Sequence, residues 1–154
     1  GDNKIDLLNN PVDAIGSVAN YFKSNGWKTN EAIATRAKII ADNYDEAITS
    51  KDLKTASTLA DIKSKGLDVK DGAFASTMPA SALRLQGENG AEFWLAFNNF
   101  YVITTYNRST LYAMAVMQLS QALKEARAQV NSSQSLVPII EATSVTSPDV
   151  PSTL

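Results

Sequence analysis

The chain has 154 residues, enough for one domain or for part of a larger one, and its 44% hydrophobic and 19% charged residues are typical of a globular protein. Its formal net charge of -2 gives no broad basic surface, so we expect no nucleic-acid partner. Cysteine and histidine are both absent, which excludes thiol and histidine catalysis and metal sites built on those residues, and leaves carboxylates, tyrosine, lysine or an oxygen-bound cation.

A first helix is predicted to begin after Asn10. Asparagine is a good N-cap, Pro11 suits the first helical position, and Asp13 lies near the positive end of the helix. Asn25 and Gly26 supply the C-terminal stop. Between these ends, apolar residues recur at helical spacing at Val12, Ile15, Ala19 and Phe22. The pattern therefore predicts one amphipathic helix in this segment.

The next part of the chain predicts a strand, an ambiguous stretch and a short helix. Alternating side chains over residues 31–40 are typical of a strand. Residues 41–57 fit either a helix or a loop. Thr58, with Asp61 three residues on, forms a variant of the capping box, so a second helix is predicted to begin there and to end at Gly66.

A β-hairpin and two helices are predicted next. Residues 83–85 alternate, 88–90 carry a turn signal, and 92–95 form the returning strand. An apolar and aromatic segment at 98–105 predicts a short helix. A long helix follows over about residues 109–130, with a predicted buried stripe of Leu111, Ala115, Leu119, Ala122, Ala126 and Val130. Residues 131–154, rich in Ser, Thr and Pro, are predicted to form a tail.

Tyrosine and asparagine side chains gather around the start of the long helix. Tyr106 and Asn107 precede it and Tyr112 lies in its first turn, while Tyr21 falls off the apolar stripe of the first helix. A tyrosine ring stacks on the apolar face of a sugar, and an asparagine amide both donates and accepts hydrogen bonds. The alternative is that Tyr106 and Tyr112 are core residues, Asn107 caps the helix, and Tyr21 lies at the core edge.

Oxygen-bearing residues near the N-terminus are candidate ligands for Ca²⁺, which binds six to eight oxygen atoms. The carboxylates of Asp2, Asp6 and Asp13 and the carbonyl of Lys4 could serve as ligands. The alternative interpretation is a polar turn with Asp13 as a helix-capping residue. The spacing alone does not decide between the two.

Several segments, in order, resemble the MltB-type lytic transglycosylases that cleave bacterial peptidoglycan. Asp2–Asp13 is similar to the second half of the family's EF-hand-like Ca²⁺ loop, and Asn10–Trp27 to the helix that follows it. Thr58–Leu67 and Leu83–Leu85 are similar to parts of its small accessory region, and Asn99–Val116 to its glycan-cleft motif. The resemblance covers about residues 1–128.

The resemblance implies an α+β fold, a mainly helical lysozyme-like fragment over residues 1–130 with a small antiparallel β accessory region at about 31–97. It implies a periplasmic enzyme, free or attached to the outer membrane, that cuts the MurNAc–GlcNAc β-1,4 bond of glycan strands and leaves 1,6-anhydroMurNAc ends. The implied glycan-binding residues are Tyr21, Tyr106, Asn107 and Tyr112. The implied Ca²⁺ ligands are Asp2, Asp6, Asp13 and the Lys4 carbonyl.

The chain departs from the family in one respect. The family's catalytic glutamate precedes the Ca²⁺ loop, and none of the glutamates here lies in a matching motif: Glu31, Glu46, Glu88, Glu92, Glu125 and Glu141. We therefore expect no catalytic residue in this chain, and expect it to be the C-terminal part of such an enzyme, paired with the missing N-terminal part or with a copy of itself. Two other interpretations stay open: a non-catalytic module that binds peptidoglycan or a protein, and a self-associating structural domain.

Overall fold

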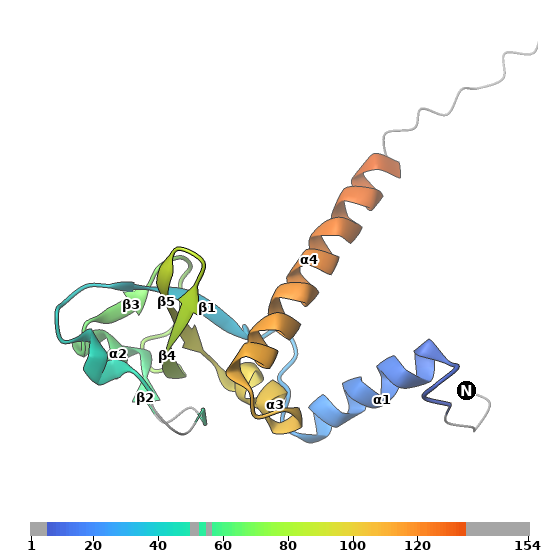
Figure 1. The fold of residues 1–154 in the computed structure, drawn as a ribbon, viewed down its shortest axis with the longest axis horizontal. Helices are drawn as coiled ribbons and strands as arrows, with labels where there is room; N and C mark the ends of the chain where they lie inside the picture. The colour runs from blue at the N-terminus through green and yellow to red at the C-terminus, as the bar shows by residue number, and fades with distance from the viewer. Residues whose placement is uncertain (1–5, 50–52, 55–56, 135–154) are drawn as a thin grey trace, which may run out of the picture. The chain divides into compact units, whose positions relative to one another are not determined.

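The computed structural model describes residues 6–49, 53–54 and 57–134 (Figure 1). The chain divides into two compact units, Gly1–Gln118 and Leu119–Leu154. Within the described part of the second unit, residues 119–134 continue the last helix. The tail expected over residues 131–154 lies outside the described residues beyond Gln134.

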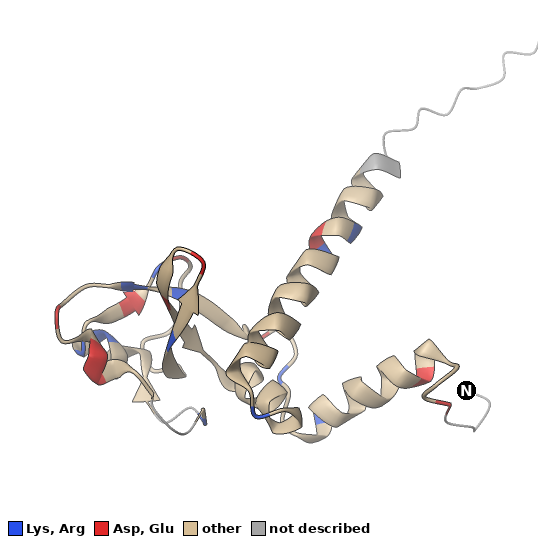
Figure 2. Ribbon diagram, in the orientation of Figure 1, with Lys and Arg blue, Asp and Glu red and all other residues tan. Residues whose placement is uncertain are grey.

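Helix α1, Pro11–Ser24, has the ends that the sequence predicted. The Asn10 side chain accepts a hydrogen bond from the Val12 N–H at 3.0 Å, and the chain leaves the helix at Asn25. No residue of α1 is buried, and the apolar stripe is open, with Val12 76% and Ile15 70% exposed. The α1 ribbon carries few charges (Figure 2), and the exposed Val12, Ile15 and Val18 show that its apolar face is not covered by the described residues.

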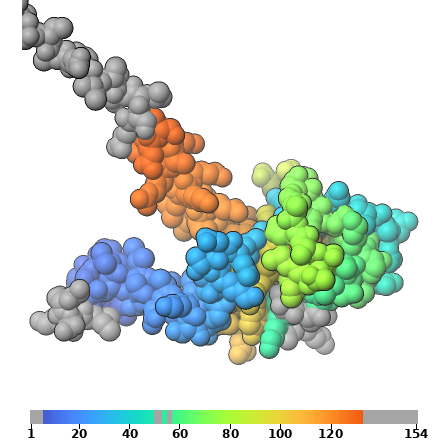
Figure 3. All heavy atoms as spheres, turned by 180° about the vertical axis from the view of Figure 1, so that it is seen from behind, coloured from blue at the N-terminus to red at the C-terminus, as the bar shows by residue number. Residues whose placement is uncertain are grey.

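The sheet has five strands in the order β2-β4-β5-β1-β3, and all its strand pairs are antiparallel. Its centre is the predicted hairpin of β4, Pro79–Gly87, and β5, Gly90–Ala96, in which Leu83 faces Trp94. Figure 3 shows part of this hairpin at the surface in yellow-green, while residues 80–83 of β4 and 94–96 of β5 are buried. The strand predicted at 31–40 is β1, Ala34–Ile39.

Two short strands complete the sheet. They are β2, Ser57–Thr58, and β3, Leu67–Val69, neither of which the sequence predicted. Each pairs with a strand distant in the chain, β2 with β4 and β3 with β1. Strands of two or three residues carry too little alternation to be recognised without their partners.

The structure also shows what forms in the ambiguous stretch at residues 41–57 and in the second predicted helix. A 3-10 helix, η1, covers Tyr44–Ala47, and α2 covers Leu59–Ser64. The predicted capping box is confirmed, because the Asp61 N–H donates to the Thr58 hydroxyl at 3.2 Å and the Asp61 carboxylate accepts from the Thr58 N–H at 3.1 Å. The chain turns away at Gly66, whose φ of 93° favours glycine.

The last two helices are α3, Asn98–Tyr106, and α4, Thr110–Gln134. The stripe predicted to be buried on α4 is wrong, since Leu111 is 67% and Leu119 61% exposed. The residues buried on α4 are instead Ala113, Met114 and Met117. No helix among the described residues is long and apolar enough to cross a membrane.

The sheet has an apolar cluster on each face, because alternate residues of β4 point to opposite sides. Ala80 and Ala82 join one cluster, which α2 covers with Leu59 and Ile62. Leu83 joins the other, which contains residues of α3 and the first turns of α4: Phe100, Ile103, Ala113, Met114 and Met117. The α+β expectation is confirmed. The second cluster fixes the junction between α3 and α4 against the sheet.

Candidate functional site

A row of aromatic rings runs along α1, the following loop, the end of α3 and the start of α4. Phe22 stacks on Trp27 with ring centres 5.6 Å apart, and Tyr21 meets Phe22 edge-on at 6.1 Å. Tyr21 also meets Tyr106 edge-on at 5.5 Å, and Tyr106 stacks near Tyr112 at 6.2 Å with 24° between the planes. The structure therefore brings together three of the predicted site residues, which come from three different elements.

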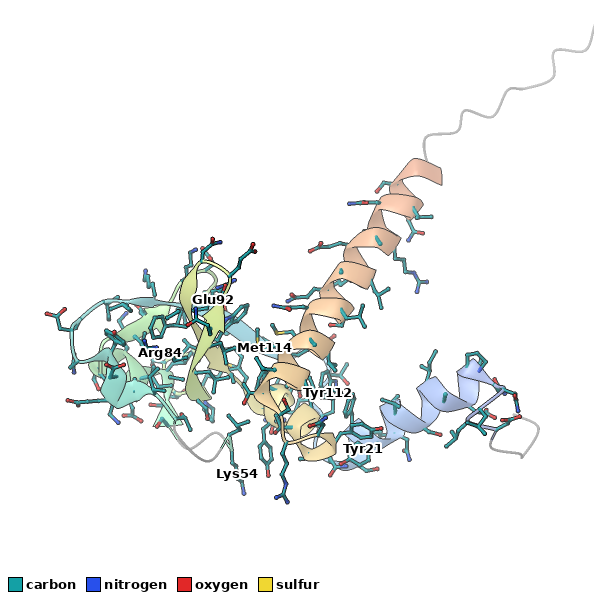
Figure 4. The ribbon with its side chains drawn as sticks, viewed as in Figure 1. Tyr21, Lys54, Arg84, Glu92, Tyr112 and Met114 are labelled. Carbon is teal, nitrogen blue, oxygen red and sulfur yellow. The ribbon has the colours of Figure 1, made fainter. Side chains whose placement is uncertain are left out.

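The aromatic row is open to solvent on its tyrosine side. Tyr106 is 60% exposed, and Tyr21 and Tyr112 are half-buried. Figure 4 shows Tyr21 and Tyr112 near one another beside α3. A core role for Tyr106 is therefore wrong. Exposed ring faces held by neighbouring rings can stack on a flat apolar ligand surface with little loss of side-chain entropy.

Asn107 lies in the turn between α3 and α4, and Ser109 is the residue that caps α4. Its side-chain oxygen accepts a hydrogen bond from the Ser109 N–H at 3.1 Å, which shapes the turn between α3 and α4. The Ser109 hydroxyl in turn accepts from the Tyr112 N–H at 3.2 Å, as an N-cap residue does. Among the described residues, nothing accepts from the Asn107 side-chain nitrogen. That amide can donate to a ligand beside Tyr106.

A buried amide holds the loop between α1 and β1 against α3. Asn99 is fully buried, donates to the carbonyls of Lys28 at 2.8 Å and Glu31 at 3.0 Å, and accepts from the Lys28 N–H at 2.9 Å. Asn98 adds a bond to the Gly26 carbonyl at 2.9 Å. These bonds fix the loop that carries Trp27, and through it the end of α1 that carries Tyr21.

The sequence analysis did not identify Asn99 as a positioning residue. One signal was present: Asn99 lies three and four residues before Val102 and Ile103, on the buried face of α3. A polar residue on a buried helix face needs hydrogen-bond partners. The sequence could have shown that Asn99 needs partners, but not which backbone groups they are.

The candidate metal ligands are only partly described, because Asp2 and Lys4 lie outside the described residues. The Asp6 N–H donates to the Asp13 carboxylate at 3.0 Å. The Asp6 carboxylate accepts from the N–H groups of Leu8 and Asn9 and from the Asn9 side chain. These bonds, those from the Asn9 N–H above all, lower the pKa of Asp6.

The hydrogen bonds at Asp6 and Asp13 form the polar turn that the sequence offered as the alternative to a metal site. A carboxylate has about four acceptor positions. The four bonds to Asp6 use about that many, whereas the one bond to Asp13 leaves its carboxylate able to bind a cation. No group of three or more acidic residues that could hold a metal occurs within the described ranges. A cation here would therefore need the oxygen atoms of residues 1–5 as well.

Two glutamates near the sheet and the α1–β1 loop are held in ion pairs. Glu92 accepts from Arg36 at 2.8 Å and from the Trp94 indole at 3.2 Å, while Arg36 lies over the Trp94 ring at 4.3 Å. Glu31 lies 3.6 Å from the Lys28 ammonium group. Both carboxylates therefore have structural partners.

Comparison with known proteins agrees with this geometry. Residues 1–121 match the family model described as a transglycosylase SLT domain. The chain is 42% identical over 129 residues to the membrane-bound lytic murein transglycosylase B of Escherichia coli (strain K12). That match covers 84% of this chain but 34% of the relative, so the chain spans about a third of the relative's length.

Three solved structures are similar. Lytic transglycosylase SltB1 of Pseudomonas aeruginosa has a TM-score of 0.75 and 40% identity over 82% of this chain and 41% of that one. Escherichia coli Slt35 in complex with calcium has a TM-score of 0.69 and 41% identity over 83% and 39%. SltB3 of Pseudomonas aeruginosa with NAG-anhNAM-pentapeptide has a TM-score of 0.66 and 32% identity over 80% and 33%. The lysozyme-like α+β expectation is therefore confirmed.

Proposed function

Because the chain belongs to the transglycosylase SLT domain family, we propose that it supplies part of the glycan-binding cleft of a peptidoglycan lytic transglycosylase. The whole protein would cut the MurNAc–GlcNAc β-1,4 bond and leave 1,6-anhydroMurNAc ends. The identity to a lytic murein transglycosylase supports this reaction class, as does the similar structure that holds a NAG-anhNAM ligand. A periplasmic or outer-membrane location, suggested by the membrane-bound relative, is part of the same proposal.

The observation that carries the proposal is the pair of the exposed Tyr106 and the half-buried Tyr112 beside Asn107. Tyr106 and Tyr112 have nearly parallel planes with centres 6.2 Å apart, and the Asn107 amide nitrogen is available to a ligand among the described residues. We propose that a sugar ring stacks on this pair while Asn107 donates to one of its hydroxyl or acetamido oxygens. Tyr21 supports Tyr106 from α1 and lines the next sugar position.

The chemical step needs an acid that we do not assign to this chain. In the proposed reaction one glutamate protonates the glycosidic oxygen and then accepts the proton of the MurNAc 6-hydroxyl, which attacks within the same sugar. The role of residues 6–118 is to hold the sugar so that this attack is geometrically favoured. We propose that the glutamate belongs to the part of the protein for which this chain, at 34% of its relative, does not account.

The open apolar face of α1 supports the proposal that another part of the protein packs against this chain. Ile15 and Val18 are 70% and 46% exposed, and with Ala14, Ala19 and Phe22 they line a hollow of about 460 Å³. An uncovered apolar face of this kind is typical of an interaction surface. We propose that the remainder of the same polypeptide covers it, and that pairing with a second copy is the alternative.

A Ca²⁺ site is the second part of the proposal. Asp6 and Asp13 are already joined through the Asp6 N–H, and the carboxylate of Asp2 and the carbonyl of Lys4 would complete the oxygen set. The similar structure solved with calcium supports this assignment. If it holds, added Ca²⁺ raises the melting temperature and the Asp13→Asn variant loses that increase. An equal increase in both proteins would contradict it.

The direct test is to digest purified peptidoglycan with the full-length protein that contains this chain. We expect products with 1,6-anhydro ends, each lighter by one water molecule than the hydrolysis product. Tyr106→Ala is expected to weaken glycan binding about fivefold or more, since an aromatic stack contributes roughly 1 kcal/mol. Leu111→Ala, an exposed change beside Tyr112, is the control. Binding without any turnover would instead favour a non-catalytic peptidoglycan-binding module.

A further inference from the structure

The pair Asn-Gly occurs twice in the chain, at Asn25-Gly26 and at Asn89-Gly90. An asparagine before glycine is the one most prone to lose its side-chain amide, because glycine has no Cβ to shield the backbone nitrogen that attacks the amide carbon. One pair lies at the end of α1 and the other at the turn of the β4–β5 hairpin, and both asparagines are exposed. The two pairs therefore share one chemistry and one exposure class.

Hydrogen bonds hold the first pair in place. The Asn25 side-chain nitrogen donates to the Tyr21 carbonyl at 2.8 Å, which ties the amide to the last turn of α1. The Gly26 N–H donates to the Lys23 carbonyl at 3.2 Å, and the Gly26 carbonyl accepts from the Asn98 side chain at 2.9 Å. Attack of the Gly26 nitrogen on the Asn25 amide therefore requires at least two of these bonds to break first.

The second pair lacks such bonds to its asparagine side chain. Glu88 and Asn89 are the two turn residues of the hairpin, and Gly87 and Gly90 form the last pair of its ladder. Among the residues that the structure describes, none bonds to the Asn89 side chain. The last pair of a ladder opens more easily than the pairs behind it. The Asn89 amide is therefore free to approach the Gly90 nitrogen.

We propose that Asn89 is a site of spontaneous deamidation and that the fold protects Asn25 from the same reaction. The Gly90 nitrogen bonds to the side-chain carbonyl carbon of Asn89, the bond from that carbon to the amide nitrogen breaks, and ammonia leaves. Water then opens the five-membered imide at either carbonyl, which gives aspartate or isoaspartate. Nothing is oxidised or reduced, and the inference does not depend on the proposed glycan function.

The reaction changes the charge and the length of the turn. Either product adds one negative charge beside Glu88, and isoaspartate also lengthens the main chain by one CH₂ group. We expect the closing pair of Gly87 and Gly90 to be lost. The register farther along the hairpin should remain, because Leu83 faces Trp94 and both are buried. The change is thus confined to the tip of the hairpin.

The experiment incubates the full-length protein that contains this chain at mildly alkaline pH, once folded and once in concentrated urea. Trypsin places the two pairs in separate peptides, residues 24–28 and 85–108, which mass spectrometry follows over time. In the folded protein we expect Asn89 to react roughly tenfold faster than Asn25 or more, because Asn25 must first lose its hydrogen bonds. In urea the two rates should become similar, since those bonds are gone.

A variant and fragment spectra assign the reaction to one residue. Asn89→Gln places the amide carbon one CH₂ group farther along the side chain, so it should abolish the mass change in peptide 85–108 and leave the melting temperature unchanged. Fragment spectra separate Asn89 from the other asparagines of that peptide, which are Asn98, Asn99 and Asn107. Equal rates at the two pairs in the folded protein, or a faster loss at Asn25, would overturn the inference. So would a folded protein that keeps Asn89 intact while the urea-unfolded protein reacts.

Discussion

At the scale of single residues, the candidate site depends on amides as much as on rings. Asn99 makes three hydrogen bonds to the loop that carries Trp27, and it is fully buried. Asn107 shapes the turn before α4, and its side-chain nitrogen has no acceptor among the described residues. Positioning residues of this kind let an exposed tyrosine pair stay ordered.

Asn99→Ala is expected to lower the free energy of unfolding by roughly 2–4 kcal/mol, because it removes a fully buried side chain together with its three hydrogen bonds to the Lys28 and Glu31 backbone. Asn98→Ala is the matched control, since it loses the exposed bond to the Gly26 carbonyl and a long one of 3.5 Å to the Asn99 oxygen, and should cost about 1 kcal/mol or less. Urea denaturation of both variants measures the difference. Similar losses for the two variants would argue against the positioning role of Asn99.

A pH dependence follows from the capping box of α2. The Thr58 hydroxyl and N–H lower the pKa of Asp61 below its ordinary value of 3.8. Its stabilising contribution is therefore present above pH 3.8 and is lost as the pH falls through the folded-state pKa. Asn9 acts on Asp6, and Lys63 on Asp68, in the same direction.

Asp61→Asn should therefore lose less stability than the unaltered protein between about pH 6 and about pH 3, because its side chain does not titrate there. Chemical denaturation at the two pH values measures this. Asp71→Asn, an exposed change outside any helix or strand, is the control and should behave like the unaltered protein. An unchanged pH dependence in the Asp61 variant would show that the capping box does not control acid stability.

The sequence indicated some of the candidate-site residues but not all of them. Tyr106, Asn107 and Tyr112 were identifiable as candidates because the chemistry of a ring or an amide is visible in the residue itself. Asn99 was not, because its partners are backbone groups of Lys28 and Glu31, 71 and 68 residues away. No local pattern records such a long-range bond.

At the scale of elements, α4 shows how a helix can be predicted with the wrong face buried. Its start was predicted correctly, because Ser109 and the turn before it are local signals. The buried residues are Met114 and its neighbours, because the second apolar cluster meets only the first turns of the helix. The predicted stripe followed a regular spacing along the whole of α4, and it therefore did not include the residues that are packed.

Met117→Ala is expected to destabilise the protein by about 2–5 kcal/mol, the usual cost of truncating a buried methionine. Leu111→Ala on the same helix should change stability by about 0.5 kcal/mol or less, because Leu111 is 67% exposed. Thermal and urea unfolding compare the two. A larger loss of stability for Leu111→Ala than for Met117→Ala would instead favour the buried stripe that the sequence predicted.

The strands also differ in whether the sequence could predict them, depending on whether their pairing partner is near or far in the chain. The hairpin of β4 and β5 was predicted because its turn and alternation lie within one continuous segment. β2 and β3 exist only through pairing with β4 and β1, so their two and three residues gave no signal of their own. The helix ends at Asn10 and Thr58 were predictable because capping is local.

At the scale of the whole molecule, we propose that one part of the enzyme supplies the glycan contacts and another part supplies the acid. The open apolar face of α1 is where we place the contact between them. Ile15→Ser tests this placement. In the 154-residue chain alone the change should be close to neutral, because the side chain is 70% exposed.

In the full-length protein the same Ile15→Ser change should cost about 2 kcal/mol or more, since a covered isoleucine would be replaced by a polar group. Calorimetry on both proteins measures the contrast. Gly16→Ala, at a position with open space around its Cβ, should behave alike in both and serves as the control if the remaining polypeptide does not cover it. Equal effects of Ile15→Ser in both proteins would place the contact elsewhere.

The central claim is that Tyr106, Tyr112 and Asn107 hold a peptidoglycan sugar. The most direct measurement is the structure of the full-length protein with a bound glycan strand. We predict a sugar ring in stacking contact with Tyr106 or Tyr112 and a hydrogen bond from the Asn107 amide to that sugar. A glycan bound elsewhere, with these three residues free of contact, would contradict the account.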